Sequence, residues 1–242
     1  MTVRAPAKLT LSLRVTGVRP DGYHLLDAEM VTVDLADVLT FESGANVLPP
    51  DDLVSRALRA VGRDARVTVD KRIPVGAGLG GGSADAAAVL RWAGCDDLAL
   101  AAQIGADVPF CLVGGRARVT GVGEVVEPLA FEERVFTLLT PPFGVSTADV
   151  YRAWDRMSGP ARGGGPEITP AGDGANDLEP AALMVEPRLA EWRDRLGDAS
   201  GRAPVLAGSG STWFVEGELP GDGELPGDSR RVVRTVRMDR IR

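Results

Sequence analysis

Residues 75–90 read VGAGLGGGSADAAAVL, with five glycines in seven residues running directly into an alanine-rich helical pattern. A glycine-rich turn that opens onto a helix presents unpaired backbone N–H groups and the positive end of the helix dipole, and this arrangement binds phosphate. Residues 66–73 alternate as a strand that Pro74 stops, and the helix from Ser83 to Trp92 ends at Gly94. The segment therefore predicts a strand, a phosphate loop and a helix in succession.

Several interpretations compete for this loop. A P-loop requires a lysine after its glycines, and Gly82 is followed directly by Ser83. Residues 76–81 satisfy the G-x-G-x-x-G pattern of dinucleotide-binding proteins, but the preceding strand alternates polar residues, and Asp96 and Asp97, where a ribose-binding acid is expected, resemble helix caps. The sequence favours a nest of N–H groups around a triphosphate over a merely flexible loop, because linkers do not usually open onto a helix.

The hydrophobic pattern of the first half predicts further strands and helices. Alternation indicates a half-buried strand from Lys8 to Gly17, with its apolar residues on one face, and one or two strands over 29–41, after a Pro-Asp-Gly turn. Helical spacing covers 51–61 and 98–104, and strand signals return at 110–113, 117–120 and 135–139. Strands that are paired before the helices, rather than strictly alternating with them, predict an α+β fold.

The second half has a weaker pattern. Residues 141–154 lead into a helix, 158–174 form a loop rich in glycine and proline, and short helices follow near 178–185 and 188–196. Residues 205–215 are typical of a strand, a glycine turn and a strand, and 232–238 of a final strand. The hexapeptide GELPGD occurs twice in tandem over 217–228, which indicates a duplicated exposed loop.

Composition limits the partners of the chain. A net charge of −7 without blocks of like charge argues against nucleic acid, and no apolar run is long enough to cross a membrane. The N-terminus lacks a secretory signal, so we expect a cytoplasmic protein. Cys95 and Cys111 have no metal-ligand spacing, and His24 is the only histidine, so we expect two buried thiols and no structural zinc.

The basic residues are unusually uniform. Of the 27 lysines and arginines, only Lys8 and Lys71 are lysine. A site that needs a compact point charge cannot accept the planar fork of arginine. We expect Lys8, at the start of the first strand, to serve such a site, although an edge-strand lysine in solvent is the commoner case. We expect Lys71 to lie on the surface.

Four further stretches complete a resemblance to a known superfamily. They are APAKLTLSLRVTGVRPDGYH at 5–24, GADVPFCLVGG at 105–115, ANDLEP at 175–180 and AGSGS at 207–211. With the glycine loop, and in order over nearly the whole chain, they resemble the galactokinase, homoserine kinase, mevalonate kinase and phosphomevalonate kinase superfamily. The DGYH element is the most specific part.

The resemblance implies an α+β small-molecule kinase with two domains. Residues 1–134 are expected to bind ATP and residues 135–242 to bind the substrate, with the active site in the cleft between them. The implied reaction is ATP-dependent phosphorylation of the 2-hydroxyl of a cytidine diphosphate-linked polyol, 4-diphosphocytidyl-2-C-methyl-D-erythritol, in non-mevalonate isoprenoid synthesis. ATP with Mg²⁺ is the expected nucleotide, and a monomer or weak homodimer is the expected state.

The resemblance also assigns roles to single residues. Asp107, on a loop expected to re-enter a strand, is the catalytic carboxylate, with a turn-forming aspartate as the alternative, and Lys8 is its cationic partner. Ser83 offers a hydroxyl to phosphate or Mg²⁺, and Asp85 either caps the helix or lies near the metal. The expected ATP-binding residues are Pro74, Val75, Gly76, Ala77, Gly78, Leu79, Gly80, Gly81, Gly82, Ser83 and Ala84. The expected substrate-binding residues are Thr10, Tyr23, His24, Tyr151, Gly208, Ser209 and Gly210.

One departure keeps alternatives open. The superfamily branch usually carries asparagine where this chain has Thr10, and a hydroxyl lacks the paired donor and acceptor of an amide. The residue nevertheless remains able to hydrogen bond to a polyol. The alternatives are another alcohol kinase of the homoserine or mevalonate type, which should need cations for a carboxylate, or a nucleotide-binding relative without catalysis.

Overall fold

The computed structural model describes residues 1–158, 176–219 and 229–238. The predicted loop at 158–174, apart from Ser158, and most of the GELPGD duplication lie outside the described residues. No helix within the described ranges is long and apolar enough to cross a membrane.

A long antiparallel hairpin organises the first sheet. Strand β1 (Thr2–Val18) pairs with β2 (His24–Glu42) along almost its full length. Strand β3 (Arg66–Asp70) pairs with the end of β2 at residues 38–42, whereas β4 (Arg116–Gly121) pairs with its beginning at 26–31 and carries β5 (Val125–Pro128). Lys8 pairs with Thr32, which lies near the middle of β2. Lys8 is therefore midway between His24, at the start of β2, and the residues of β2 that pair with β3.

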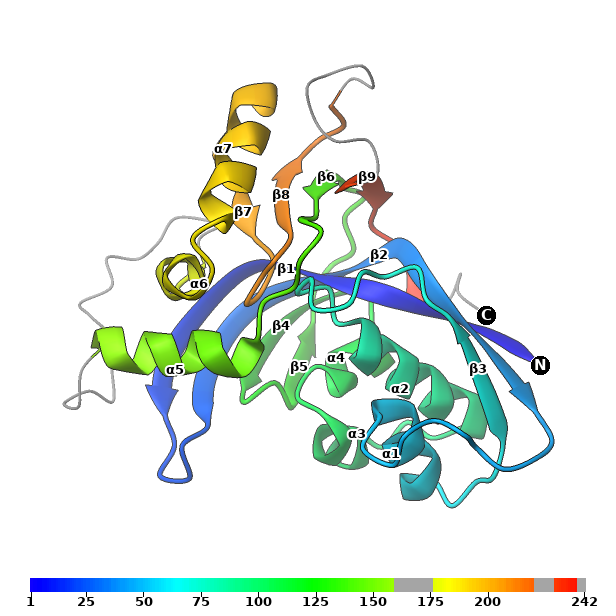
Figure 1. Ribbon diagram of the computed structural model, residues 1–242. Helices are drawn as coiled ribbons and strands as arrows, with labels where there is room; N and C mark the ends of the chain where they lie inside the picture. The colour runs from blue at the N-terminus through cyan, green and yellow to red at the C-terminus, as the bar shows by residue number, and fades with distance from the viewer. Residues whose placement is uncertain (159–175, 220–228, 239–242) are drawn as a thin grey trace.

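Four helices cover one side of this hairpin. They are α1 (Leu53–Ala60), α2 (Gly81–Ala93), α3 (Leu98–Ile104) and α4 (Val108–Val113), which gather below β1 and β2 in the view of Figure 1. Asp52 caps α1 and Asp97 caps α3 by accepting backbone N–H bonds, and Gly94 ends α2 in the left-handed conformation. The caps at Gly94 and Asp97 therefore lie where the sequence predicts them, whereas the cap at Asp52 was not predicted.

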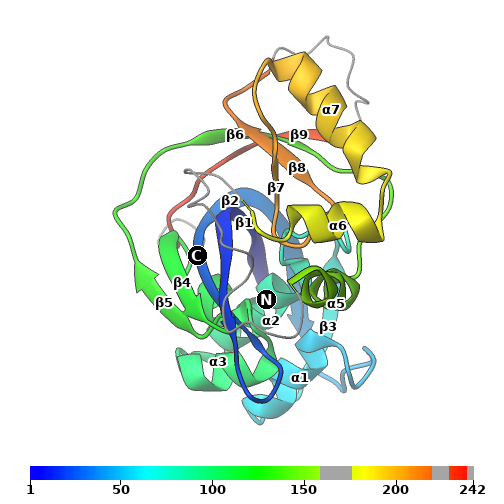
Figure 2. The same cartoon turned by 90° about the vertical axis from the view of Figure 1, so that its left-hand side faces the viewer.

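The second sheet lies on the other side of the hairpin. Its order is β7 (Val205–Leu206), β8 (Trp213–Glu216), β6 (Val135–Leu139) and β9 (Arg230–Arg234). Helices α6 (Glu179–Val185) and α7 (Leu189–Ser200) pack beside it, and α5 (Thr147–Ser158) lies between α6 above and α1 below in Figure 2. Two isolated bridges, Leu13 to Asn176 and Val33 to Thr235, join the halves of the chain.

The two sheets with helices confirm the α+β prediction, but three elements differ from expectation. Residues 110–113 are not a strand, because α4 covers them. Pro109 has no N–H to donate to a sheet, and it occupies the first turn of a helix, where no intrahelical donor is needed. Strand β5 was not predicted, and β9 ends at Arg234 rather than continuing to Met238.

The expectation of a half-buried first strand is confirmed from Leu11 to Gly17, where buried residues alternate with partly or fully exposed ones, and is wrong at Lys8 and Thr10. Residues Ala5 to Leu11 are all buried, including the polar side chains of Lys8 and Thr10. Alternation predicted an open face because it does not show what folds over that face from a distance in sequence. Here the glycine loop and the turn at 207–210 cover it, as a Cβ on Gly80 would meet the Lys8 stem and one on Gly208 would meet the Lys8 ammonium.

Alanines allow helix α2 to lie close to the sheet. Ala84, Ala86, Ala87 and Ala88 are fully buried, and α2 packs against β1, α1 and α4. Small side chains let the helix backbone approach its neighbours, and the glycine loop is carried at the N-terminus of this helix. The position of the loop thus depends on the volume of these alanines.

Substitution of Ala87 by leucine should destabilise the protein by about 1–3 kcal/mol, because the added atoms have no space between α2 and the sheet. The measurement is the midpoint of urea unfolding at constant m-value. The matched control is Ala60→Leu at the exposed end of α1, which should change the free energy of unfolding by less than about 0.5 kcal/mol. Equal midpoints for the two variants would contradict the packing argument.

Candidate active site

The glycine loop has a backbone that other residues cannot adopt at two positions. Gly78 has φ +76° and Gly80 has φ +67°, in the left-handed region. A Cβ on Gly78 would collide with the carbonyl oxygen of Ala207, and one on Gly80 would lie 2.7 Å from Cγ of Lys8. The loop is therefore pressed between the turn at 207–210 and the buried lysine of β1.

Hydrogen bonding divides the loop into a fixed side and an open side. Its carbonyl groups point into the protein: Lys8 N–H donates to Leu79 O at 3.1 Å, Thr212 N–H to Ala77 O at 3.2 Å and Val145 N–H to Gly76 O at 3.2 Å. By contrast, the N–H groups of residues 75–80 donate no hydrogen bond to any residue that the structure describes. With the free N–H groups of the first turn of α2, they form an anion-binding nest.

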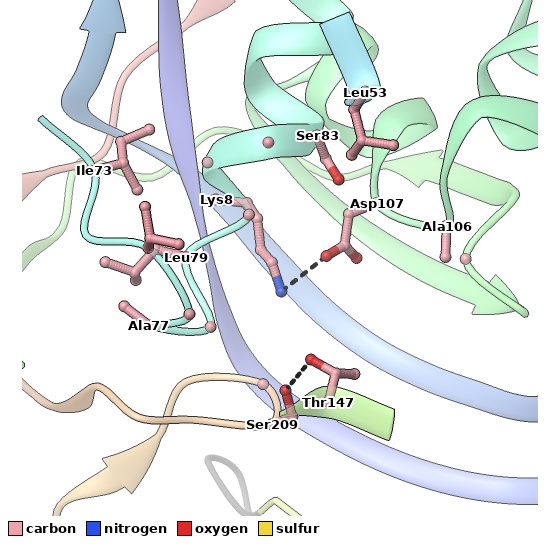
Figure 3. Close-up of a pocket in the computed structure, with 18 of the residues that line it drawn as sticks. Lys8, Leu53, Ile73, Ala77, Leu79, Ser83, Ala106, Asp107, Thr147 and Ser209 are labelled. Atoms are coloured by element: carbon pink, nitrogen blue, oxygen red, sulfur yellow. Dashed lines mark hydrogen bonds and ion pairs between the residues drawn. The ribbon is translucent and has the colours of Figure 1, made fainter. Parts of the chain in front are cut away.

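Lys8 and Asp107 form an ion pair beside this nest. Lys8 Nζ lies 3.4 Å from Asp107 Oδ2, and the Lys8 side chain is 6% exposed whereas that of Asp107 is 32% exposed. Figure 3 shows the ammonium group between the loop at Ala77 and Leu79 and the segment of Ser209 and Thr147. Asp107 is the N-terminal residue of α4 and not a loop residue before a strand, and its side chain makes no capping bond. The carboxylate is therefore free to meet a ligand.

Three of the predicted substrate residues surround the same ammonium. Thr10 Oγ1 accepts a hydrogen bond from Lys8 Nζ at 3.0 Å, and Thr10 is 1% exposed. A Cβ on Gly208 would lie 3.3 Å from that Nζ, and the Ser209 hydroxyl bonds to Thr147 Oγ1 at 2.8 Å (Figure 3). Thr10 thus contacts the lysine rather than an open surface.

A single cavity of about 1260 Å³ joins these groups. The residues from Pro74 to Ser83 line it, as do Lys8, Asp107, Tyr23, His24, Tyr151, Gly208 and Ser209. Thr10, Ala84 and Gly210 do not line it, although all three were predicted site residues. The volume exceeds the range of about 300–1,000 Å³ for one small-molecule pocket, so two substrates can be held together.

Aromatic rings form the end of the cavity near the β1–β2 turn. The rings of His24 and Tyr151 lie 4.6 Å apart with an interplanar angle of 30°, and Trp154 meets His24 edge-on at 5.4 Å. His24 Nε2 lies 2.7 Å from Asp155 Oδ1, so the imidazole donates Nε2–H to the carboxylate. Burial raises the pKa of the Tyr151 phenol, and Tyr23 is 64% exposed at the rim.

The opposite end of the cavity is apolar, and the sequence analysis missed it. Val47 and Leu48 before α1 line it together with Val67 and Val69 of β3. Alternation in β3 indicated a strand but could not show which face meets a cavity. In the structure Val47 and Val75 are 75% and 83% exposed, and both line the cavity, but the sequence carried no signal for this end.

Lys71 is exposed, as predicted, but its pairing with two buried carboxylates was not predicted. Its Nζ pairs with Asp37 Oδ2 and, at 2.9 Å, with Asp85 Oδ2, and both aspartates are buried. Asp85 does not cap α2, because Gly80 holds that position without a side-chain bond. Desolvation raises the pKa of Asp85 to about 7, against the lowering effect of Lys71, and its Oδ1 has no hydrogen-bond partner among the described residues. Sequence reasoning missed this cluster because its members are far apart in the chain.

Metal-ligand clusters are absent from the described part of the chain, in which no three His, Cys, Asp or Glu side chains could share an ion. Cys111 is buried and Cys95 half-buried, and both are free thiols. Burial raises the pKa of Cys111 to about 12, so this thiol stays protonated.

Comparison with known proteins agrees with this geometry. The model of the GHMP kinases N terminal domain matches residues 52–115, which include the glycine loop and Asp107. A 4-diphosphocytidyl-2-C-methyl-D-erythritol kinase of Paracoccus denitrificans is 42% identical over 87% of this chain and 84% of its own. One of Cereibacter sphaeroides is 39% identical over 87% of each chain.

Solved structures extend the likeness to three dimensions. The crystal structure of a 4-(cytidine 5'-diphospho)-2C-methyl-D-erythritol kinase superposes with a TM-score of 0.72 at 38% identity, over 88% of this chain and 89% of the other. Mevalonate kinase of Methanococcus jannaschii shares the fold at a TM-score of 0.60, with 11% identity and 98% of each chain covered. With its sequence matched along most of its length, the chain belongs to the 4-diphosphocytidyl-2-C-methyl-D-erythritol kinase family.

Proposed function

We propose that this chain transfers the γ-phosphoryl group of ATP to the 2-hydroxyl of 4-diphosphocytidyl-2-C-methyl-D-erythritol. The observation that carries the proposal is the Lys8–Asp107 pair at 3.4 Å, which lies between an anion-binding nest and an aromatic pocket. Membership of the kinase family supports the choice of substrate. The two ends of the cavity then correspond to the two reactants.

The Asp107 carboxylate supports the attack of the alcohol. It accepts a hydrogen bond from the acceptor hydroxyl, so that the oxygen points at the γ-phosphorus and its proton has a place to go. The new O–P bond forms as the bond from the γ-phosphorus to the β–γ bridging oxygen breaks, and ADP leaves with that oxygen. The proton passes through Asp107 to solvent.

Lys8 offsets charge in the same step. Its ammonium lies close to Asp107, Thr10 and the turn at Gly208, so it is held in place before the reactants arrive. A fixed cation in a largely water-free position stabilises the charge on the transferring phosphoryl oxygens without reorganisation. Thr10 acts through Lys8, since the threonine is buried and bonds only to the ammonium.

The glycine nest holds the triphosphate and α2 points its N-terminus at it. The free N–H groups of residues 75–80 suit phosphate oxygens, and the Ser83 hydroxyl lines the cavity at the start of α2. These donors fit the phosphates of Mg·ATP, and the Ser83 hydroxyl would offer an oxygen to a phosphate or to the metal. Mg²⁺ supplies charge neutralisation of the phosphates when bound.

The adenine of ATP and the cytosine of the second substrate fit opposite ends of the cavity. The apolar end at Leu48, Val67 and Val69 suits adenine, because it adjoins the nest and consists of aliphatic surface. The aromatic end suits cytosine, because Tyr151 and Tyr23 offer rings and His24, with Nε2 bonded to Asp155, keeps Nδ1 for the base edge.

Other expectations remain proposals. The boundary at residues 134 and 135 falls between β5 and β6, where the chain leaves the first sheet for the second, which supports an ATP-binding and a substrate-binding segment. His24 and Tyr151 come from either side of it and meet in one pocket. The cytoplasmic location and the monomeric or weakly dimeric state are likewise predictions.

Replacement of Asp107 by asparagine should lower kcat by at least about a hundredfold, because the amide cannot accept the alcohol proton. Lys8→Met should lower it by a similar factor through loss of the fixed cation. The measurement is ADP release with ATP and the cytidine diphosphate polyol, with circular dichroism to check the fold. If kcat of either variant stays within about threefold of wild type, the catalytic role proposed for that residue is wrong.

Removal of the Tyr151 ring should weaken binding of the cytidine substrate and leave ATP unaffected. Base stacking on an aromatic ring contributes about 1–3 kcal/mol, so Tyr151→Ala should raise KM for the polyol by at least about fivefold. Tyr151→Phe keeps the ring and should behave as wild type. Met157→Ala, exposed on the same helix, controls for effects on α5. An equal rise in both KM values would instead indicate general disruption.

A further inference from the structure

Three charged residues beneath the glycine loop have no part in the transfer step. Asp37 lies on β2 and is fully buried. Its Oδ1 accepts backbone N–H bonds from Arg72 at 2.5 Å and Ile73 at 2.8 Å, and its Oδ2 accepts from Lys71 Nζ. This carboxylate therefore fixes the three residues that lead into the loop, both through their backbone and through a side chain.

Lys71 links the start of the loop to its end. Its Nζ donates to Asp37 Oδ2 and also, at 2.9 Å, to Asp85 Oδ2 in the second turn of α2. The first turn of α2 rests on the same group, because a Cβ on Gly81 would lie 3.2 Å from Lys71 Nζ and 3.1 Å from Cγ2 of Ile73. Figure 3 shows Ile73 beside the entry to the loop, close to Leu79. Both ends of residues 74–80 are thus tied to one cluster, in which the two aspartates are buried and Lys71 is 36% exposed.

Such a cluster is weak evidence for stability. Buried ion pairs cost desolvation free energy that their attraction often only offsets, and an apolar cluster of equal volume does as well. A charged cluster instead fixes the relative positions of the segments that carry its side chains, because its ion pairs and hydrogen bonds form only in one arrangement. Here those segments support a loop whose N–H groups must converge on phosphate oxygens, and displacement by about 1 Å can cost about a hundredfold in rate.

We infer that Asp37, Lys71 and Asp85 are positioning residues that hold the two ends of the glycine loop in register for the phosphates of the nucleotide. The inference rests on the proposed function and adds these residues to the ATP site. They act through the loop backbone, and the loop contacts the ligand. Lys71 also lines the cavity, so direct contact with the nucleotide is the competing explanation that the experiment must separate.

The direction in which phosphate affinity changes when Asp85 is replaced distinguishes a loss of loop position from a change in electrostatic attraction. The titration is run at pH 8, above the Asp85 pKa of about 7, so that this carboxylate is charged. Asp85→Ala then removes a negative charge beneath the nest, so electrostatics alone would tighten the binding of inorganic tripolyphosphate with Mg²⁺. Loss of the tie to Lys71 should instead weaken it by at least about tenfold. Asp85→Asn removes the same charge but keeps an acceptor for Lys71 Nζ, and should bind within about threefold of wild type or tighter.

The experiment is calorimetric titration of the full chain with tripolyphosphate and separately with ATP. Lys71→Met should weaken both ligands by a similar factor of about tenfold, since the loop binds the part that they share. Arg72→Met is the matched control, because its partner is the exposed Asp70 and it does not line the cavity; both affinities should be unchanged. Urea midpoints, recorded for every variant, identify any that is unfolded at the assay temperature.

Two results would overturn the inference. One is Asp85→Ala binding tripolyphosphate as tightly as wild type or more tightly. The other is Lys71→Met weakening ATP while tripolyphosphate is unaffected, which would mean that Lys71 touches the base or ribose. If Asp85→Ala does not fold, Asp37→Ala gives the same test of sign, because Asp37 also pairs with Lys71 and does not line the cavity. If the wild-type protein binds neither ATP nor tripolyphosphate, the proposed kinase function is wrong. Failure of the kinase assignment can therefore be distinguished from failure of the inference about loop position.

Discussion

The contact between the Lys8 stem and Gly80 is the constraint on which the site depends. It brings the glycine loop down onto the first strand, so that the strand is buried on its polar face and the ammonium emerges beside Asp107. Only glycine permits the approach and the backbone conformation together. The next residue, Gly81, lies against Lys71 Nζ in the same way. The two lysines of the chain thus lie under consecutive glycines of one loop.

This placement explains why both positions are lysine in a chain whose other basic residues are arginine. A planar guanidinium is wider than an ammonium and needs room for five donors. The lysine side chains themselves lie close to these glycines, because a Cβ on Gly80 would be 2.7 Å from Lys8 Cγ and one on Gly81 would be 3.2 Å from Lys71 Nζ. The acidic partners of the two ammonium groups are single carboxylate oxygens. The restriction is steric as well as electrostatic, and it acts at the two points where the loop meets its support.

Much of this architecture could be predicted from sequence, and the limits are physical. Helix caps such as Asp97, the turn before His24 and the glycine loop are local features, so the sequence contains their causes. The strand predicted at 110–113 is a helix because Pro109 suits a first helical turn, a choice that apolar character alone does not reveal. The apolar end of the cavity and the Asp37–Lys71–Asp85 cluster join residues 14 or more positions apart, and periodicity carries no information on such contacts.

Thr10 illustrates how the structure changes the meaning of a departure from a family pattern. As a lost substrate contact, a hydroxyl in place of an amide implies a weaker enzyme. In the fold its hydroxyl accepts a bond from the Lys8 ammonium and is shielded from the cavity. The buried lysine needs acceptors more than the site needs another donor, because burying an ammonium without hydrogen-bond partners costs free energy. Thr10 and Asp107 together supply them, so the substitution preserves the cation on which phosphoryl transfer depends.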